Sequence, residues 1–154
     1  MANTYTQLYV HGVFAVRSRQ NLIFDSHAEE IRKYMCGIVT NLGSKPIAVN
    51  TMPDHCHILV GLKPTISVSE LLGKVKSGSS GFINKQRFVP GRFEWQDGFG
   101  AFSYAHSQLD IIIAYINNQV QHHRIKSFHE EYIELLDEFK IEYDERYIFK
   151  EMQL

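Results

Sequence analysis

Apolar and polar positions along the chain follow two different periods, and each period indicates one kind of secondary structure. Four segments carry short apolar runs bounded by turn residues, as strands do: about 5–17, 45–52, 55–62 and about 99–105. Four longer segments repeat apolar residues at three- and four-residue spacing, as amphipathic helices do: 27–42, 67–86, 107–122 and 128–139. The first six segments run strand, helix, strand, strand, helix, strand, which is the ferredoxin-like order.

This order predicts an α+β fold of the ferredoxin-like, or RRM-like, kind. We expect an antiparallel sheet of four to five strands with helices on one face, followed by a C-terminal helix that bears Tyr115. The sequence contains no internal repeat and no low-complexity tract. Serines and glycines at residues 76–81 interrupt the second helical pattern, so this stretch is either a kink or a place where a phosphate backbone can approach closely.

The length and composition are those of one globular domain. The 154 residues are 44% hydrophobic, which is enough to form one core. There is no apolar run long enough to cross a membrane and no signal peptide at the N-terminus, so we expect a cytoplasmic protein. The two cysteines, Cys36 and Cys56, make no disulfide framework, and we expect both to be reduced thiols.

The net charge of −1 conceals an uneven distribution along the chain. Residues 1–126 contain 13 Lys and Arg against 8 Asp and Glu, whereas residues 127–154 contain 3 against 9. The first segment is therefore about +5 and attracts phosphate groups, while the tail is about −6. We predict a catalytic domain over 1–126 and an acidic helical extension over 127–154 that packs on the same domain through its apolar side chains.

Two histidines flank one cysteine in the third predicted strand. Because successive side chains of a strand point to opposite faces, His55 and His57 share one face with roughly 6.6 Å between their Cα atoms, twice the rise per residue. That spacing allows both imidazoles to hold one cation, while Cys56 points to the other face as a small buried residue. The alternative is an ordinary pair of surface or hydrogen-bonded histidines.

The third helical segment presents a second group of polar residues. Ser107 is a candidate N-cap, and the core-facing residues repeat at three- and four-residue spacing: Leu109, Ile112, Ile113, Ile116 and Val120. Tyr115, Gln119 and His122 form a different stripe and are neighbours on one side of the helix. A tyrosine thus lies beside an amide that can bind a cation. The alternative is that Tyr115 flanks the core and Gln119 is a solvated helix residue.

Two motifs together resemble a known family. A His55-Cys56-His57 strand followed by a helical Tyr115-Ile-Asn-Asn-Gln119 is similar to the single-tyrosine HUH transposases of simple bacterial insertion sequences and their repeat-associated relatives. The likeness covers nearly the whole chain in order and spacing: residues 9–19, 52–60, 76–80, 95–103, 115–123, 128–132 and 143–147. Two departures leave a host role open beside transposition, since Cys56 replaces a bulky aliphatic residue and the acidic tail is longer than a minimal catalytic core requires.

The resemblance implies a metal-dependent single-stranded DNA endonuclease and strand transferase, which is a transposase. Tyr115 would attack a phosphodiester and form a 5′-phosphotyrosine intermediate, which conserves the bond energy for rejoining. His55, His57 and Gln119 would hold the divalent cation, Mg²⁺ or Mn²⁺, and the imidazoles suit Mn²⁺ better. The sequence has no Gly-rich phosphate-binding loop, so we expect no nucleotide cofactor.

The resemblance also implies the partners of the protein. The substrate would be single-stranded DNA with hairpin structure, and the protein would be a homodimer with composite active sites. In the family the tyrosine helix of one subunit often completes the site of its partner, and the sequence leaves open whether Tyr115 acts in its own subunit or across the interface. Six residues are candidate DNA contacts: Arg17, Lys74, Lys76, Arg92, Trp95 and His122. His122 is also a candidate base for Tyr115 or a cap of the helix end, and His11 is interpreted as structural or adjacent to DNA.

Two other classes of function stay open. A domesticated, non-catalytic protein that binds single-stranded nucleic acid would bind without metal and form no covalent adduct. The alternation of basic and aromatic residues on one strand that such proteins use is absent from the sequence. A metal-dependent hydrolase that uses His55 and His57 with water as the nucleophile would stay active after Tyr115→Phe.

Overall fold

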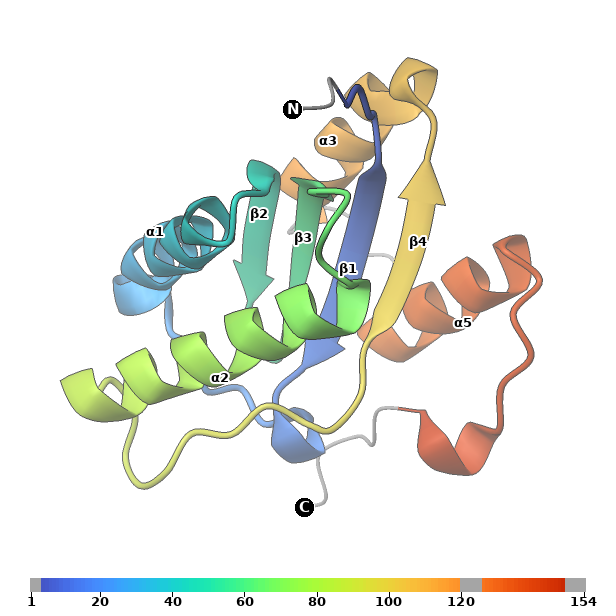
Figure 1. The fold of residues 1–154 in the computed structure, drawn as a ribbon. Coiled ribbons are helices and arrows are strands. Elements are labelled where there is room, and N and C mark those ends of the chain that lie inside the picture. The colour runs from blue at the N-terminus through green and yellow to red at the C-terminus, as the bar shows by residue number, and fades with distance from the viewer. Residues whose placement is uncertain (1–3, 120–125, 149–154) are drawn as a thin grey trace.

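The chain folds around an antiparallel sheet with the ferredoxin-like strand order. The computed structural model describes residues 4–119 and 126–148, and these contain one four-stranded sheet of order β2-β3-β1-β4 (Figure 1). The strands have these bounds: β1 Tyr9–Ala15, β2 Lys45–Met52, β3 His55–Gly61 and β4 Gly100–Tyr104. The α+β, ferredoxin-like prediction is confirmed, and the strands differ from the predicted ones only at their ends.

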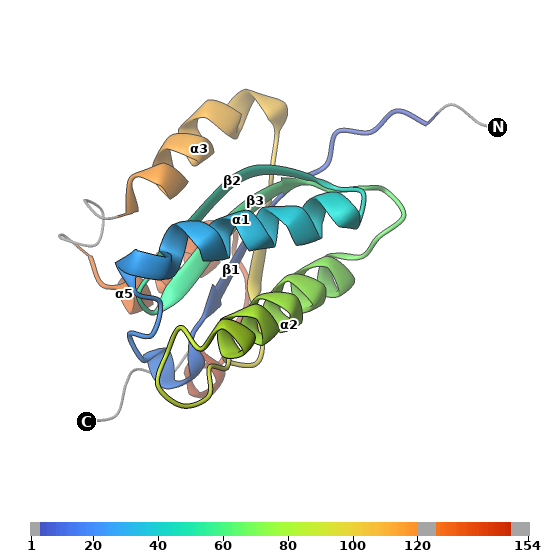
Figure 2. The same cartoon turned by 90° about the vertical axis from the view of Figure 1, so that its left-hand side faces the viewer.

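Helices cover both faces of this sheet (Figure 1, Figure 2). One face packs against α1, Asp25–Asn41, and α2, Val68–Gln86. The opposite face packs against α3, Leu109–Asn117, and α5, Phe128–Glu138. Because strand side chains alternate between faces, Phe14 and Ile58 join the first core while Val13 and Leu59 join the second. The expected helices on one face are therefore α1 and α2, and the later helices close the other.

The serine- and glycine-rich stretch lies inside α2 and does not interrupt it. Ser67 caps the helix, because its hydroxyl accepts a hydrogen bond from the Glu70 backbone N–H at 3.0 Å. The hydroxyls of Ser77, Ser79 and Ser80 donate to backbone carbonyls three residues earlier. A Cβ atom at Gly78 would lie 2.6 Å from Ile38 Cδ1, so this glycine permits the close approach of α1 to α2.

The tyrosine-bearing helix α3 is shorter at its start than predicted. Ser107 lies within a 3-10 turn at residues 106–108 and does not cap α3, so that part of the prediction is wrong. The Gln108 side chain instead accepts a hydrogen bond from the Ala105 backbone N–H at 2.8 Å, which stabilises the turn. The far end of the predicted helix, including Val120 and His122, lies outside the described residues.

The acidic C-terminal segment folds back onto the sheet through α5. Ser127 caps this helix by accepting from the Glu130 backbone N–H at 3.2 Å. Its buried apolar side chains pack against the face that β1 and β4 present: Phe128, Tyr132, Leu135 and Leu136. A Cβ at Gly100 of β4 would lie 2.7 Å from Tyr132 Cε1, so the tyrosine ring rests directly on the strand backbone. The division into domains 1–126 and 127–154 stays a prediction.

Two further observations concern membrane-spanning segments and the cysteines. No helix in the described part of the chain is long and apolar enough to span a membrane. Cys36 and Cys56 are both free thiols. Burial raises the pKa of the Cys56 thiol, whose Sγ lies 3.9 Å from Met35 Sδ, so this inward-facing cysteine stays protonated and unreactive.

The contact between Gly100 and Tyr132 gives a test of α5 docking. We expect Gly100→Ala to lower the free energy of unfolding by about 1–3 kcal/mol, because the new methyl group displaces the tyrosine ring. Urea denaturation measures the change. Gly73→Ala is the control, since no atom lies within 4 Å of the new Cβ and alanine favours a helix. In a Tyr132→Ala background Gly100→Ala should cost much less, and an unchanged cost would contradict the docked position of α5.

Candidate active site

β3 places the two histidines side by side on the sheet face that α3 and α5 cover. His55 and His57 are 1% and 0% exposed, and their ring centroids lie 5.2 Å apart. Cys56 points to the opposite face, as the alternation of the strand predicts. The Phe128 ring of α5 stacks on the His55 ring with 4.0 Å between centroids. The histidine pair is therefore buried and is not an exposed surface pair.

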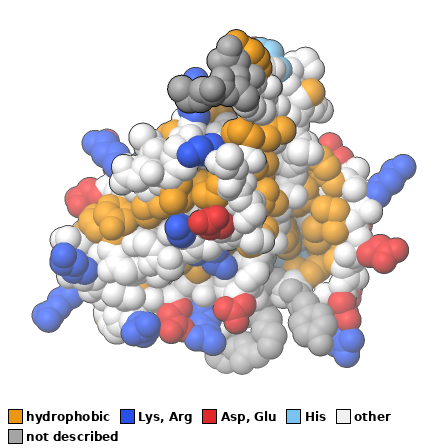
Figure 3. All heavy atoms as spheres, viewed as in Figure 1, with side chains coloured by type: hydrophobic (Ala, Val, Ile, Leu, Met, Phe, Trp, Pro, Cys, Tyr) orange, Lys and Arg blue, Asp and Glu red, His pale blue; other side chains and the backbone are white. Residues whose placement is uncertain are grey.

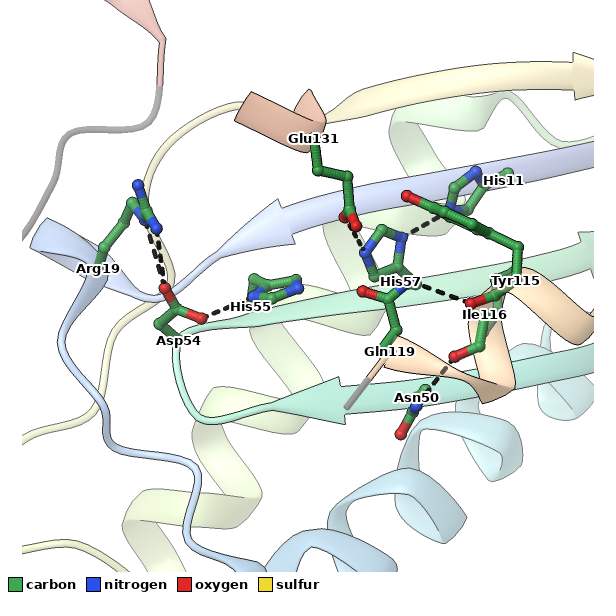
Figure 4. Close-up of polar contacts among 10 residues, drawn as sticks. All are labelled: His11, Arg19, Asn50, Asp54, His55, His57, Tyr115, Ile116, Gln119 and Glu131. Carbon is green, nitrogen blue, oxygen red and sulfur yellow. Dashed lines mark hydrogen bonds and ion pairs between the residues drawn. The ribbon is translucent and has the colours of Figure 1, made fainter. Parts of the chain in front are cut away.

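An acidic residue orients His55. Asp54 Oδ1 lies 2.6 Å from His55 Nδ1, and Arg19 donates to Asp54 Oδ2 at 3.1 Å and 3.3 Å (Figure 4). Burial alone would raise the pKa of Asp54, but its hydrogen bonds and charge interactions with His55 and Arg19 lower this pKa below its ordinary value. The ionised Asp54 thus accepts the Nδ1 proton, and Nε2 is the His55 atom that remains to bind a cation.

His57 lies between two other titratable side chains. Its Nδ1 is 2.8 Å from His11 Nε2, and its Nε2 is 2.9 Å from Glu131 Oε1 (Figure 4). His11 comes from β1, whose Val13 is the register partner of His57 in β3. Burial and the neighbouring His57 hold the pKa of His11 well below its ordinary value, so His11 is neutral. The sequence left His11 as structural or adjacent to DNA, and its burial and its contact with His57 fit a structural role.

α3 brings Tyr115 to the same cluster within one chain. The ring of Tyr115 meets His57 edge to face, with 5.8 Å between centroids. Ile112 and Ile116 anchor α3 on Leu59, and Asn50 donates to the Ile116 carbonyl at 2.9 Å. Burial raises the pKa of Tyr115 strongly, and the charge and hydrogen bond of Glu131 raise it further. Tyr115 is therefore a phenol that donates a hydrogen bond at neutral pH.

Gln119 lies beside Tyr115, as the helical spacing predicts. Its side chain is 0% exposed, and its Nε2 donates to the Tyr115 backbone carbonyl at 3.1 Å. Figure 4 shows the side chain directed toward His57. A hydrogen bond from Gln119 also acts to lower the pKa of Tyr115 against the larger effects of burial and Glu131. The structure thus brings together the four residues predicted for this site, which are His55, His57, Tyr115 and Gln119.

Glu131 is the site residue that sequence reasoning missed. It belongs to α5 and is only 2% exposed, although its side chain carries a carboxylate. The signal was present, because Glu131 shares a helix face with Phe128, Tyr132 and Leu135 at three- and four-residue spacing. An acidic residue inside an apolar stripe needs a buried partner, and here the partners are His57 and Tyr115.

The cluster fits a divalent cation. His55, His57 and Glu131 each offer one ligand atom, and these atoms lie within 4.8 Å of one another. Two imidazole nitrogens and one carboxylate oxygen form a donor set that suits a divalent transition-metal ion. The contact of Asp54 with His55 and that of His11 with His57 are the outer hydrogen bonds that metal-binding histidines normally have.

Most of the predicted DNA-binding residues lie elsewhere. Arg17, Lys76, Arg92 and Trp95 line one hollow beside α2, on the opposite side of the sheet from α3 and α5. Arg17 and Arg92 both pair with Glu94, and Lys76 Nζ donates to the Gln96 and Gly98 carbonyls at 2.8 Å each. On this face Lys and Arg side chains alternate with Asp and Glu (Figure 3). The hollow therefore has cations at its rim and no uniformly basic surface.

Trp95 and the remaining predicted contacts differ in their exposure. Trp95 is 8% exposed, packs edge to face on Phe14 and Phe93, and donates from Nε1 to Ser79 Oγ at 2.9 Å. Trp95 is mostly buried, so little of its ring is open to stacking with a base. Lys74 is exposed and pairs with Glu70 at 3.3 Å. His122 lies outside the described residues.

Comparison with known proteins identifies the family. The family model described as "Transposase IS200 like" matches residues 4–119. A candidate transposase from Deinococcus radiodurans R1 is 21% identical, with a TM-score of 0.58 over 77% of this chain and 95% of that one. A REP-associated tyrosine transposase bound to a REP hairpin is 15% identical, with a TM-score of 0.58 over 79% of this chain and 73% of that one.

The similarity to these two structures establishes the fold. No curated protein matches the chain. The family model carries the assignment, since it covers most of the sequence and includes both histidines of β3, Tyr115 and Gln119. Glu131 lies beyond the matched residues. The chain therefore belongs to the IS200-like transposase family, whose members are tyrosine transposases.

Proposed function

We propose that this transposase is a metal-dependent endonuclease and strand transferase of single-stranded DNA, and that Tyr115 is its nucleophile. The observation that carries the proposal is the position of Tyr115, whose ring packs against His57 of the histidine pair in the same chain. The phenolic oxygen attacks phosphorus, and the bond from phosphorus to the 3′ oxygen breaks. Tyr115 loses its proton as the new bond forms, and the departing 3′ oxygen takes up a proton. A 5′-phosphotyrosine intermediate results.

The protein groups around Tyr115 prepare this step. Packing of α3 on Leu59 fixes the tyrosine beside the histidine pair, and the hydrogen bond from Gln119 to the Tyr115 carbonyl holds the end of the helix. His55 and His57 are proposed ligands of Mg²⁺ or Mn²⁺, and their nitrogen donors favour Mn²⁺. Gln119 is the third ligand that the sequence predicts, and this role stays a prediction. When bound, the cation supplies charge neutralisation at the scissile phosphate.

The proposed substrate is single-stranded DNA close to a hairpin. The similar REP-associated tyrosine transposase is bound to a REP hairpin. In this chain Arg17, Lys76 and Arg92 would contact the DNA backbone at the hollow beside α2, and the exposed Lys74 would add a further phosphate contact. His122 stays a candidate contact, whereas the burial of Trp95 removes the reason for proposing base stacking there.

Replacement of Tyr115 tests the nucleophile. Incubation with 3′-labelled single-stranded DNA from the flanks of the gene, with Mn²⁺, should transfer the label to the protein, and Tyr115→Phe should reduce this adduct at least about a hundredfold. A denaturing gel measures the labelled band, which should also vanish in EDTA. Tyr5→Phe is the matched control, because Tyr5 is 89% exposed. Full cleavage by Tyr115→Phe would instead indicate that water is the nucleophile.

The Asp54 contact gives a test of the cation site that does not depend on DNA. We expect Asp54→Asn to weaken Mn²⁺ binding by about 10- to 100-fold, because His55 loses the acceptor that orients its ring. Calorimetric titration with Mn²⁺ measures the affinity. Asp25→Asn is the control, since Asp25 lies in the first turn of α1 on the other side of the sheet. Equal Mn²⁺ affinity of both variants would contradict the role of Asp54.

Mixing two inactive variants tests the expected homodimer with composite sites. Tyr115→Phe chains retain the histidine pair, and His55→Ala chains retain the tyrosine. Composite sites would restore adduct formation in the mixture. The packing of Tyr115 on His57 of its own chain predicts no restoration beyond that of the separate variants. Adduct yield on the same labelled DNA decides between the two arrangements, and size-exclusion chromatography of the mixture reports whether a dimer is present.

A further inference from the structure

We infer that Glu131 of α5 is the carboxylate ligand of the divalent cation, so that the C-terminal helix forms part of the metal centre of its own chain. The inference rests on the proposed metal-dependent function and adds a residue outside the family match, which ends at residue 119. It also assigns a chemical role to the acidic C-terminal segment. In that role α5 contributes a ligand in addition to covering the sheet.

The positions of the three ligand atoms support a common cation. Glu131 Oε1 is 2.9 Å from His57 Nε2, and all three ligand atoms lie within 4.8 Å of one another. Two ligands that each lie about 2.1 Å from one cation are separated by at most roughly 4.2 Å. A side-chain adjustment of a few tenths of an ångström therefore brings the set to binding distance. The backbones of β3 and α5 need not move.

The hydrogen bonds outside the cluster can accommodate the cation without a change in proton number. His11 Nε2 and His57 Nδ1 lie 2.8 Å apart, so one of these two nitrogens carries the proton between them, and His57 Nε2 lies 2.9 Å from Glu131 Oε1. With a cation, His57 uses its Nε2 lone pair as a ligand and carries its proton on Nδ1. His11 Nε2 then accepts that proton in a hydrogen bond, and His11 carries its own proton on Nδ1. Each imidazole keeps one proton, so His11 is a positioning residue for His57.

The cleft beside Tyr115 also favours a cation at this place. It lies between α3 and α5, and its lining includes three carboxylates: Glu131, Glu134 and Glu138. Their negative charge attracts a divalent cation, and Glu131 also contacts His57. The same helix therefore supplies both the carboxylate ligand and further negative charge near it.

Gln119 has a different set of contacts. Its amide nitrogen is bound to the Tyr115 backbone carbonyl, and a hydrogen bond from its side chain acts on the Tyr115 phenol. These contacts fit a residue that positions the tyrosine. A carboxylate also compensates the charge of a divalent ion in a buried site, which a neutral amide cannot do. We therefore assign the third ligand position to Glu131 and the positioning of Tyr115 to Gln119.

Titration of the full chain with Mn²⁺ alone tests this assignment. We expect Glu131→Gln to weaken Mn²⁺ binding at least about tenfold, because the neutral amide keeps the shape and loses the charge. Glu130→Gln is the matched control on the same helix, since Glu130 is exposed and does not line the cleft. In thermal unfolding, Mn²⁺ should raise the midpoint of the parent and of Glu130→Gln, and should raise that of Glu131→Gln much less.

The outcomes separate this inference from the proposed function. Equal Mn²⁺ affinity of Glu131→Gln and the parent, together with loss of binding in Gln119→Ala, would overturn the assignment and leave the metal-dependent function standing. No Mn²⁺ or Mg²⁺ binding by the parent would overturn both. If Glu131→Gln unfolds, infrared difference spectra of the parent with ¹³C-labelled glutamate serve instead. Mn²⁺ should shift a glutamate carboxylate band in the parent and not in His55→Ala, and the absence of any shift in the parent would also overturn the assignment.

Discussion

A buried carboxylate needs partners, and this constraint links α5, β3 and α3 on the side of the sheet that carries the candidate active site. Glu131 is almost completely excluded from water, and its partners His57 and Tyr115 come from β3 and α3. An unpaired charge in that position would cost several kcal/mol, on the order of the whole stability of a small domain. The docking of α5, the position of α3 and the orientation of His57 are therefore parts of one arrangement. His11 extends it to β1.

The two faces of the sheet carry different electrostatic properties. α3 and α5 enclose the tyrosine, the histidines and a cleft lined by carboxylates, which suits a cation. The hollow beside α2 is lined by Arg17, Lys76 and Arg92 together with Glu94 and Asp97, and its cations are the proposed contacts for a phosphate backbone. Together these features are consistent with the opposite net charges of the first 126 residues and of the tail. In the proposed reaction, the scissile phosphate would lie at Tyr115 beside the cation, and the hollow beside α2 would contact the DNA backbone farther along the strand.

Sequence reasoning succeeded where a single element carries the information. The alternation of β3 placed His55 and His57 on one face, and the helical spacing placed Gln119 beside Tyr115. It failed at Ser107 because a 3-10 turn and a cap use the same residue types. It did not decide whether Trp95 contacts DNA or lies in the core, because the neighbours of Trp95, Phe14 and Ser79, come from other elements. The packing role of Gly78 was not predictable either, because its neighbour Ile38 belongs to another helix.

Local periodicity was sufficient to specify the order of strands and helices and the residues that point to the same side of each. These properties follow from backbone geometry within one element, and so they are readable without any partner. The contact of Glu131 with the histidine cluster and that of His11 with His57 arose only from packing. They join elements that lie far apart in the chain, and their distances depend on how α5 and β1 meet β3 in space. No repeating pattern along the sequence encodes that meeting.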